Sequence, residues 1–312
     1  MIEIRLYNPL LHQEWNRFVH DSKNATFLHL REYMDYHSDR FADCSLMAYN
    51  DGKLLAILPA NRVDSTLYSH QGLTYGGWLM PLKHFNVTNM LAVWEAMKEF
   101  LPSIGINSLI YKPSPHIYHK YPAEEDLYAI FRHNGSIIET NVASSIPLDN
   151  ALDFNYTYRK AVNTARNNNI VITEEQQCNR YWHLLSSLLQ EKYDTNPVHS
   201  LSEISLLKER FPENIRLFTA SVDGRILAGV LVYCTHTVAH AQYIASNEEG
   251  RSKGALPLLF KHLISTVFAD KKHFDLGTSN ENHGLYLNEG LILQKSHLGG
   301  RAIVYNTYKI DF

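Results

Sequence analysis

The chain has 312 residues, of which 45% are hydrophobic and 20% charged, and its formal net charge is −3. This composition supplies apolar residues for two globular domains and excludes a largely disordered chain. Neither half has the basic surplus typical of nucleic-acid binding, so DNA is not an expected partner.

The first half contains a predicted β-hairpin over residues 44–61, which turns at Asp51-Gly52. Asp-Gly between two apolar runs favours a type I′ turn, because that turn needs positive φ at both positions. The elements that follow are a strand at 66–70, a Gly-rich loop at 71–78, a helix at 86–101, a strand from 107, a helix at 123–132 and a strand at 136–146.

The second half begins with predicted helices at 155–169 and 179–193. Ser200 and Glu203 have the spacing of a capping box, which predicts another helix. A second hairpin, over 215–234, turns at Asp223-Gly224. The elements that follow are a strand at 237–246, a polar loop at 247–255, a helix at 255–269, a strand at 273–277, a short helix near 283–288 and a strand at 302–310.

The same order of elements therefore occurs twice. We interpret the chain as two tandem domains, residues 1–149 and 150–312, which share one architecture. No low-complexity linker separates them, so we expect them to pack closely.

Hairpin, strand, loop, helix, strand, helix and strand is also the order of the GNAT acyltransferase fold. The run from 274 to 301 resembles the signature of the tandem-GNAT group that includes the FemABX peptidyltransferases and their FemAB-like (BioF2-like) relatives. The residues that carry this resemblance are Asp275, Gly277, Gly284, Leu285, Lys295, Gly299 and Gly300. It implies an α/β (α+β) fold of two GNAT-like domains, each a mixed, mostly antiparallel sheet flanked by helices. The coiled-coil arm of several cell-wall FemABX enzymes, which is associated with aminoacyl-tRNA use, is absent.

The resemblance implies acyl-CoA, such as acetyl-CoA, as the donor. A helix N-terminus with nearby cations suits its pyrophosphate. We assign this role in the second domain to Arg251, Ser252, Lys253, Gly254 and Ala255. Leu256 departs from the family's pattern of a final small residue, which puts acyl-CoA binding in doubt.

The Gly-rich loop of the first half has no Lys or Arg. We therefore assign Tyr75, Gly76 and Gly77 to the wall of the acceptor cleft, with a degenerate donor site in this domain. Asn280 is assigned to the cofactor and Lys295 to the acceptor substrate.

Catalysis needs an acid for the leaving thiolate and a base for the acceptor amine. Tyr286 lies four residues before Gly290-Leu291, the spacing of the acid in GNAT enzymes. The candidate bases are Asp275, His240 and His70. Strand alternation predicts that His240 and Gln242 share one face, with Ala241 and Tyr243 on the other.

Three scattered cysteines fit a reducing compartment, and no signal peptide or membrane span is predicted, so we expect a cytoplasmic protein. No metal-ligand spacing occurs, so no metal is expected. The predicted function is transfer of an acyl group from acyl-CoA to an amine, on a nucleotide-sugar or a surface-glycan precursor. The alternatives are an aminoacyl-tRNA-dependent transferase, although tRNA is disfavoured as a partner, and a non-catalytic binding protein of the same fold. The sequence does not determine the oligomeric state.

Overall fold

The computed structural model describes residues 1–312, in two units that each have a hydrophobic core. Unit 1 comprises Met1–Asn141, Asn282–Leu285 and Val304–Phe312, and unit 2 comprises Val142–Glu281 and Tyr286–Ile303. Unit 1 therefore takes a strand from the C-terminal end of the chain.

Both Asp-Gly turns form as predicted. Asp51 and Gly52 have φ of 49° and 78°, and Asp223 and Gly224 have φ of 47° and 74°. Positive φ at both positions is the requirement of a type I′ turn, and its twist matches that of the two strands it joins. The turns join β2 (Leu46–Asn50) to β3 (Lys53–Leu58) and β9 (Ile215–Val222) to β10 (Arg225–Cys234).

In unit 1, one sheet has the order β1-β2-β3, and a second set of strands has the order β4-β5-β6-β15. The strand pairs of unit 1 are antiparallel except β5–β6, which is parallel. The remaining elements are β1 (Ile2–Leu6), α1 (His12–Asp21), α2 (Arg31–Met34), β4 (Asn61–Val63), β5 (Thr66–Tyr68), α3 (Val87–Ser103), β6 (Ser108–Tyr111), α4 (Glu125–Arg132) and β15 (Arg301–Asp311). Trp78, Trp94 and Tyr111 are fully buried in its core.

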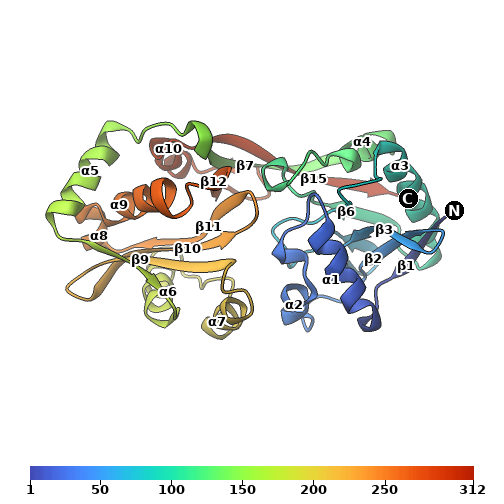
Figure 1. Ribbon diagram of the computed structural model, residues 1–312, viewed down its shortest axis with the longest axis horizontal. Coiled ribbons are helices and arrows are strands. Elements are labelled where there is room, and N and C mark those ends of the chain that lie inside the picture. Colours follow the sequence, from blue (N-terminus) through green and yellow to red (C-terminus); the bar gives the residue numbers. More distant parts are fainter. The chain divides into compact units, whose positions relative to one another are not determined.

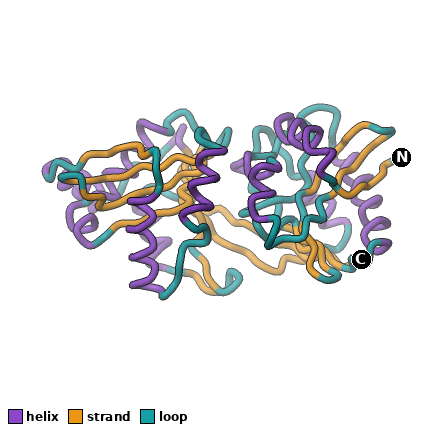
Figure 2. The backbone as a smooth tube through the Cα atoms, turned by 90° about the horizontal axis from the view of Figure 1, so that it is seen from below, coloured by secondary structure: helices purple, strands orange, loops and turns teal.

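In unit 2, the strand order is β7-β12-β11-β10-β9-β8, and the pair β11–β12 is parallel whereas the others are antiparallel. Figure 1 shows α5, α8 and α9 on one face of these strands and α6 and α7 on the other, and Figure 2 shows the strands between the helices from a second direction. The elements are β7 (Ser136–Pro147), α5 (Tyr156–Asn167), β8 (Val171–Glu175), α6 (Asn179–Tyr193), α7 (Leu201–Arg210), β11 (Val238–Ser246), α8 (Glu248–Lys253), α9 (Ala255–His262), β12 (His273–Thr278) and α10 (Glu289–His297).

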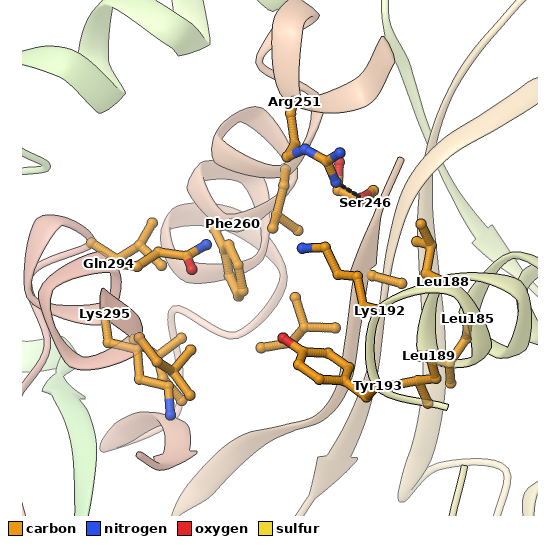
Figure 3. A pocket seen from close by; sticks show the side chains of 16 residues that line it. Leu185, Leu188, Leu189, Lys192, Tyr193, Ser246, Arg251, Phe260, Gln294 and Lys295 are labelled. Atoms are coloured by element: carbon orange, nitrogen blue, oxygen red, sulfur yellow. Dashed lines mark hydrogen bonds between the residues drawn. The ribbon is translucent and has the colours of Figure 1, made fainter. Parts of the chain in front are cut away.

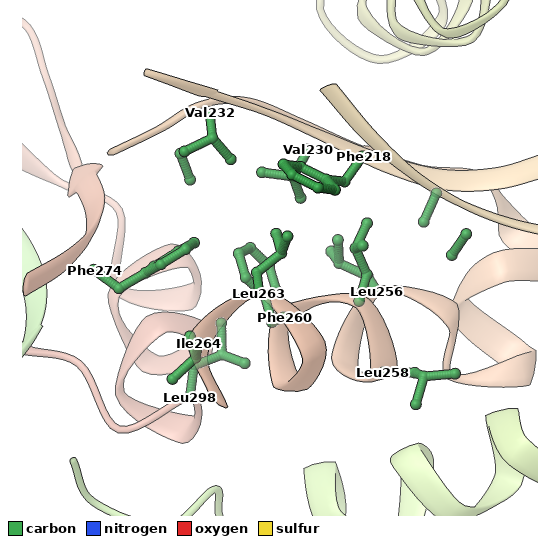
Figure 4. Packing of buried hydrophobic residues seen from close by; sticks show 14 of the residues in the cluster. Phe218, Val230, Val232, Leu256, Leu258, Phe260, Leu263, Ile264, Phe274 and Leu298 are labelled. Carbon is green, nitrogen blue, oxygen red and sulfur yellow. The ribbon is translucent and has the colours of Figure 1, made fainter. Parts of the chain in front are cut away.

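The apolar stripe of α9 forms the centre of the unit 2 core. Leu256, Leu259 and Leu263 recur at helical spacing, and all three are buried. Figure 4 shows the helix side chains turned toward Phe218 and Val230 of the hairpin strands. The predicted helix is confirmed, with a π-helical turn over its last residues, Leu263–Val267.

Two local predictions are wrong. The polar segment 247–255 contains the short helix α8, because the Asn247 side chain accepts a hydrogen bond from the Gly250 amide and caps the turn. The predicted helix at 283–288 is part of a hairpin of β13 (Asn280–Glu281) and β14 (Tyr286–Leu287), and the helix α10 begins only at Glu289. Asn282, His283 and Gly284 have positive φ, which no α-helix accommodates.

None of the helices combines the length and the apolar composition that a membrane crossing needs.

Candidate acyl-transfer site

The parallel strands β11 and β12 pair with each other only at their beginning. Val238–His240 is in register with His273–Asp275, and the pairing ends there although both strands continue. Beyond His240 the facing strand edges no longer bond to each other. On β11 the Tyr243 carbonyl oxygen accepts from the Tyr181 hydroxyl (3.0 Å) and the Ser246 carbonyl oxygen from Arg251, so the backbone groups that this edge can offer a bound molecule are the ones between these two contacts and His240.

A cavity of about 280 Å³ lies where the two strands diverge. Helices from both faces of the sheet contribute to its wall, as Figure 3 shows. The lining residues are Leu185, Leu188, Leu189, Lys192 and Tyr193 of α6, Ile244, Ala245 and Ser246 of β11, Arg251 of α8, Leu256 and Phe260 of α9, Leu276 of β12, and Leu291, Gln294, Lys295 and Leu298 from α10 and the residue after it.

All charged residues that line the cavity are cations, namely Lys192, Arg251 and Lys295. Arg251 donates a hydrogen bond from Nη1 to the carbonyl oxygen of Ser246 (2.8 Å), which holds its guanidinium at the end of β11. With the charges of Lys192 and Arg251 and no carboxylate in the wall, the cavity favours an anionic ligand.

A β-bulge interrupts β11 inside the site. Leu231 is opposite Tyr243 and Val232 is opposite Ala241, so Gln242 is the extra residue. The predicted face alternation is therefore wrong at this point: Ala241 joins the core under α9, whereas the Tyr243 hydroxyl lies 2.6 Å from Nδ1 of His199 just before α7. A bulge re-aims the residues on either side of it, and this one lies beside the unpaired strand edge.

Asp275 and His240 form a pair at the last paired position of β11 and β12. Nδ1 of His240 lies 2.9 Å from Oδ2 of Asp275, and the Gly277 amide donates to Oδ1 at 2.9 Å. Asp275 is fully buried, whereas the His240 side chain is 15% exposed. A His240 Nδ1–H that donates to the carboxylate leaves Nε2 as the ring atom able to accept a proton.

Lys295 closes the end of β12 from helix α10. Its ammonium donates to the carbonyl oxygens of Gly277 (2.8 Å) and Thr278 (2.6 Å). Burial lowers the pKa of Lys295 to about 8, and the charge of Asp275 opposes that shift. In Figure 3 the ammonium points away from the middle of the cavity, so its stem rather than its charge forms the wall.

The predicted donor residues separate into two groups. Arg251 lines the cavity, but Ser252 donates to the carbonyl oxygen of Glu249 and Lys253 pairs with the Glu249 carboxylate at 2.8 Å. Gly254 has a φ of 72°, and a Cβ there would lie 2.2 Å from the carbonyl oxygen of Ala161 in α5. Ala255 is fully buried. Helix α5 therefore covers the start of α9, where the sequence predicted the phosphates.

Asn280 and Tyr286 lie on the β13–β14 hairpin and do not line the cavity. The Asn280 Oδ1 accepts from the Val142 amide at 2.6 Å, which fixes the hairpin to β7. Tyr286 is 56% exposed.

The other predicted residues belong to unit 1. His70 and Tyr75 are buried, and burial, with the nearby His37, lowers the pKa of His70 to about 3. Gly76 and Gly77 pack against backbone and ring atoms: a Cβ would lie 2.0 Å from the Ser69 carbonyl oxygen and 2.8 Å from the Tyr111 hydroxyl, respectively. Close packing accounts for Gly76, and at Gly77 a φ of 81° also favours glycine.

Sequence reasoning missed the contribution of α6 to the cavity. Leu185, Leu188, Leu189 and Lys192 recur at spacings of three and four residues, which is one face of a helix. That pattern was visible in the sequence, but it indicates burial in general and does not distinguish a core from a cavity wall.

The comparisons with known proteins concern the fold. A family model described as an acetyltransferase (GNAT) domain matches residues 154–283. Residues 154–283 are therefore similar to a GNAT domain. A search of curated proteins gave no match to the sequence.

Three solved structures resemble nearly the whole chain, each at 12% identity. They are FemX (TM-score 0.69, covering 99% of this chain and 97% of that one), the C-terminal domain (DUF2156) of a putative lysylphosphatidylglycerol synthetase from Agrobacterium fabrum (0.63, 97% and 92%), and a tandem GNAT protein from the clavulanic acid biosynthesis pathway (0.53, 100% and 98%). At this identity the likeness concerns the fold. The predicted FemABX-like, tandem GNAT fold is confirmed.

Proposed function

We propose that the GNAT domain transfers an acyl group from acyl-CoA to an amine. The observation that carries this proposal is the gap between β11 and β12, which has a cationic cavity at its end and the His240–Asp275 pair at its start. In this proposal a phosphorylated donor binds at the cations and His240 accepts a proton at the other side of the same gap.

The chain's residues have separate tasks in this reaction. Arg251 and Lys192 attract the donor phosphates, and the free edge of β11 offers N–H groups to the thioester oxygen. The amine nitrogen attacks the thioester carbon, the C–N bond forms and the C–S bond breaks. His240 takes the proton from the amine on Nε2 and returns it to the leaving thiolate, while Asp275 holds the ring. Neither His240 nor Tyr286 lines the cavity, but His240 lies at the gap between β11 and β12, whereas Tyr286 is exposed on the β13–β14 hairpin, so the proposal gives Tyr286 no role.

The acceptor in this proposal is the amine of a nucleotide-sugar or of another cell-surface glycan precursor. This choice rests on the resemblance to the FemABX group. The site itself requires only an uncharged amine beside His240.

One observation favours an aminoacyl-tRNA donor as the second candidate. Helix α5 covers Gly254, so the start of α9 is not open to a pyrophosphate. A tRNA ester would place its phosphates on the exposed cations and only its aminoacyl end in the cavity.

Thermal unfolding with CoA, acetyl-CoA and a charged tRNA tests these proposals. A ligand at 100 times its Kd adds about 2.7 kcal/mol to the free energy of unfolding. We expect stabilisation by CoA and acetyl-CoA that is reduced in Arg251→Ala and retained in Arg166→Ala, which removes an exposed cation outside the cavity. A response to charged tRNA alone would move the proposal to the second candidate, and no response to any donor would favour a non-catalytic binding protein.

A further inference from the structure

The cavity in the GNAT domain is mostly apolar despite its three cations. Leu185, Leu188 and Leu189 stand along one side of it in Figure 3, with Phe260 across from them. Leu276 and Leu298 of the core complete the apolar part. Ten of its 16 lining residues are Leu, Ile, Phe or Ala. A wall of this kind stabilises a ligand through the removal of apolar surface from water.

The cavity is also much larger than an acetyl group. A methylene takes up about the space of one water in the liquid, about 30 Å³. An apolar chain that filled all of the cavity of about 280 Å³ would have at most about nine such groups, and the part beside Lys192 and Arg251 belongs to the donor, so the chain is shorter than that. An acetyl group has two carbons and would leave most of the leucine wall without a contact.

The linking arm of CoA does not account for this wall. The arm contains two amides, and amides that enter an apolar space without hydrogen-bond partners are costly. The unpaired edge of β11 supplies backbone partners for amides, whereas the α6 leucines supply none. The arm therefore follows the strand edge, and the leucines face a part of the donor that needs no hydrogen bonds.

We infer that the GNAT domain takes an apolar acyl group of about four to eight carbons, held between α6 and α9 with the chain toward Leu276 and Leu298. This inference rests on the proposed function, since it names the class of acyl group at the same site. The cations of the wall remain for the donor phosphates.

Binding of a series of acyl-CoA thioesters tests the inference. The probes are CoA, acetyl-CoA, butanoyl-CoA, hexanoyl-CoA, octanoyl-CoA and dodecanoyl-CoA, and the measurement is Kd by calorimetry with the full chain. Each buried methylene should tighten binding about fourfold up to six or eight carbons. Dodecanoyl-CoA should bind more weakly than octanoyl-CoA, because its chain exceeds the cavity.

Substitutions that reduce the cavity supply the second arm of the test. Leu189→Trp fills the cavity from α6 and should move the optimum to a shorter chain. Ser187→Trp is the matched control, since Ser187 is exposed on the same helix and does not line the cavity. Leu291→Trp fills the cavity from α10 and replaces Leu189→Trp if that variant does not fold.

The outcomes are distinct. Acetyl-CoA binding as tightly as octanoyl-CoA, or equal chain-length profiles in Leu189→Trp and Ser187→Trp, would overturn the inference and leave the proposed function in place. No binding of CoA or of any thioester would overturn the proposed donor itself. A chain-length optimum that moves only with the cavity substitutions would support both.

Discussion

The two units contain the same parallel strand pair, and they treat the gap beyond it in opposite ways. In unit 1, β5 and β6 pair over Thr66–Tyr68 and Ser108–Ile110, as β11 and β12 do over Val238–His240 and His273–Asp275 in unit 2. In unit 1 the Gly76 amide then donates to the Lys112 carbonyl oxygen at 2.8 Å, so the Gly-rich loop fills the gap. In unit 2 the gap leads to a cavity. One fold thus supports a closed core or a site, and the segment after the first strand decides which.

The electrostatics of the two places differ in the same way. In unit 1 the Tyr111 hydroxyl donates to Oδ2 of Asp126 (2.7 Å) and accepts from the Trp78 amide (2.6 Å), which closes a buried network. In unit 2 the charges of Lys295 and Asp275 influence each other beside the open cavity. Beyond its parallel strand pair, unit 1 has a closed hydrogen-bond network, whereas unit 2 has buried charged groups beside a cavity.

Substitution of His240 in unit 2 and of His70 in unit 1 should give the largest difference between the two units. His240→Asn removes the proposed base and should lower kcat/KM by about 10²–10⁴. His70→Asn removes a buried ring whose Nδ1 accepts from the Gly72 amide, and should lower the free energy of unfolding by about 1–3 kcal/mol without a change in turnover per folded molecule. Steady-state kinetics and urea unfolding of both variants measure this. Equal turnover in the two variants would remove His240 from the mechanism.

Removal of the buried ammonium should destabilise unit 2. Lys295→Met leaves the Gly277 and Thr278 carbonyl groups without their donor and removes a positive charge near Asp275, for an expected loss of about 1–3 kcal/mol in the free energy of unfolding. Lys192→Met, a cavity cation on the exposed end of α6, is the control and should have little effect on stability. Urea unfolding compares them, and equal stabilities would show that the buried charge is compensated by other groups.

A methyl group added inside the filled gap should destabilise unit 1. Gly76→Ala places a methyl group 2.0 Å from the Ser69 carbonyl oxygen, and a loss of about 1–3 kcal/mol is expected from overpacking. Gly290→Ala in α10 meets no atom closer than 3.7 Å and should be neutral or stabilising, because alanine favours a helix. Urea unfolding again gives the comparison. A stable Gly76→Ala protein would mean that the loop does not close the gap tightly in solution.

The buried hydrogen-bond network of Tyr111, Asp126 and Trp78 should make the stability of unit 1 depend on pH. Burial raises the pKa of Asp126 from 3.8 to about 7, against the hydrogen bond from Tyr111. Between about pH 4 and 7 the folded state therefore binds more protons at Asp126 than the unfolded state, and this contribution to stability falls as pH rises, by up to about 1.4 kcal/mol per pH unit. In Asp126→Asn the contribution is absent, so the free energy of unfolding of the variant minus that of the unchanged protein should rise with pH.

Urea unfolding at several pH values measures that difference. Asp149→Asn, an exposed carboxylate, should follow the unchanged protein at every pH. The buried histidines act in the opposite direction: burial lowers the pKa of His29 and His119 to about 4, so their contribution is lost as pH falls below 6.5. They contribute equally to both proteins and cancel in the difference. A difference that is flat with pH would contradict the assignment to Asp126.

Local chemistry explains what the sequence predicted correctly. The Asp-Gly turns, the capping box at Ser200 and the apolar stripe of α9 each depend on residues within a few positions of one another. The resemblance carried by Asp275 and Lys295 led to the right fold, and the two residues do interact electrostatically at the end of β12. The errors at 247–255 and 283–288 are also local. The Asn247 cap makes a short helix where a loop was predicted, and a run of positive φ makes a hairpin turn where a helix was predicted.

The sequence by itself predicted the two hairpins, most of the long helices and the order of elements that both halves share, because backbone preferences and apolar periodicity act over short distances. It did not predict β1, α1, α2 or β8. Only the tertiary structure decided which gap is open, that α5 covers Gly254, that α6 lines the cavity and that His240 meets Asp275. Each of these depends on side chains from segments far apart in the chain, and no spacing within one segment specifies which residues occupy the same volume.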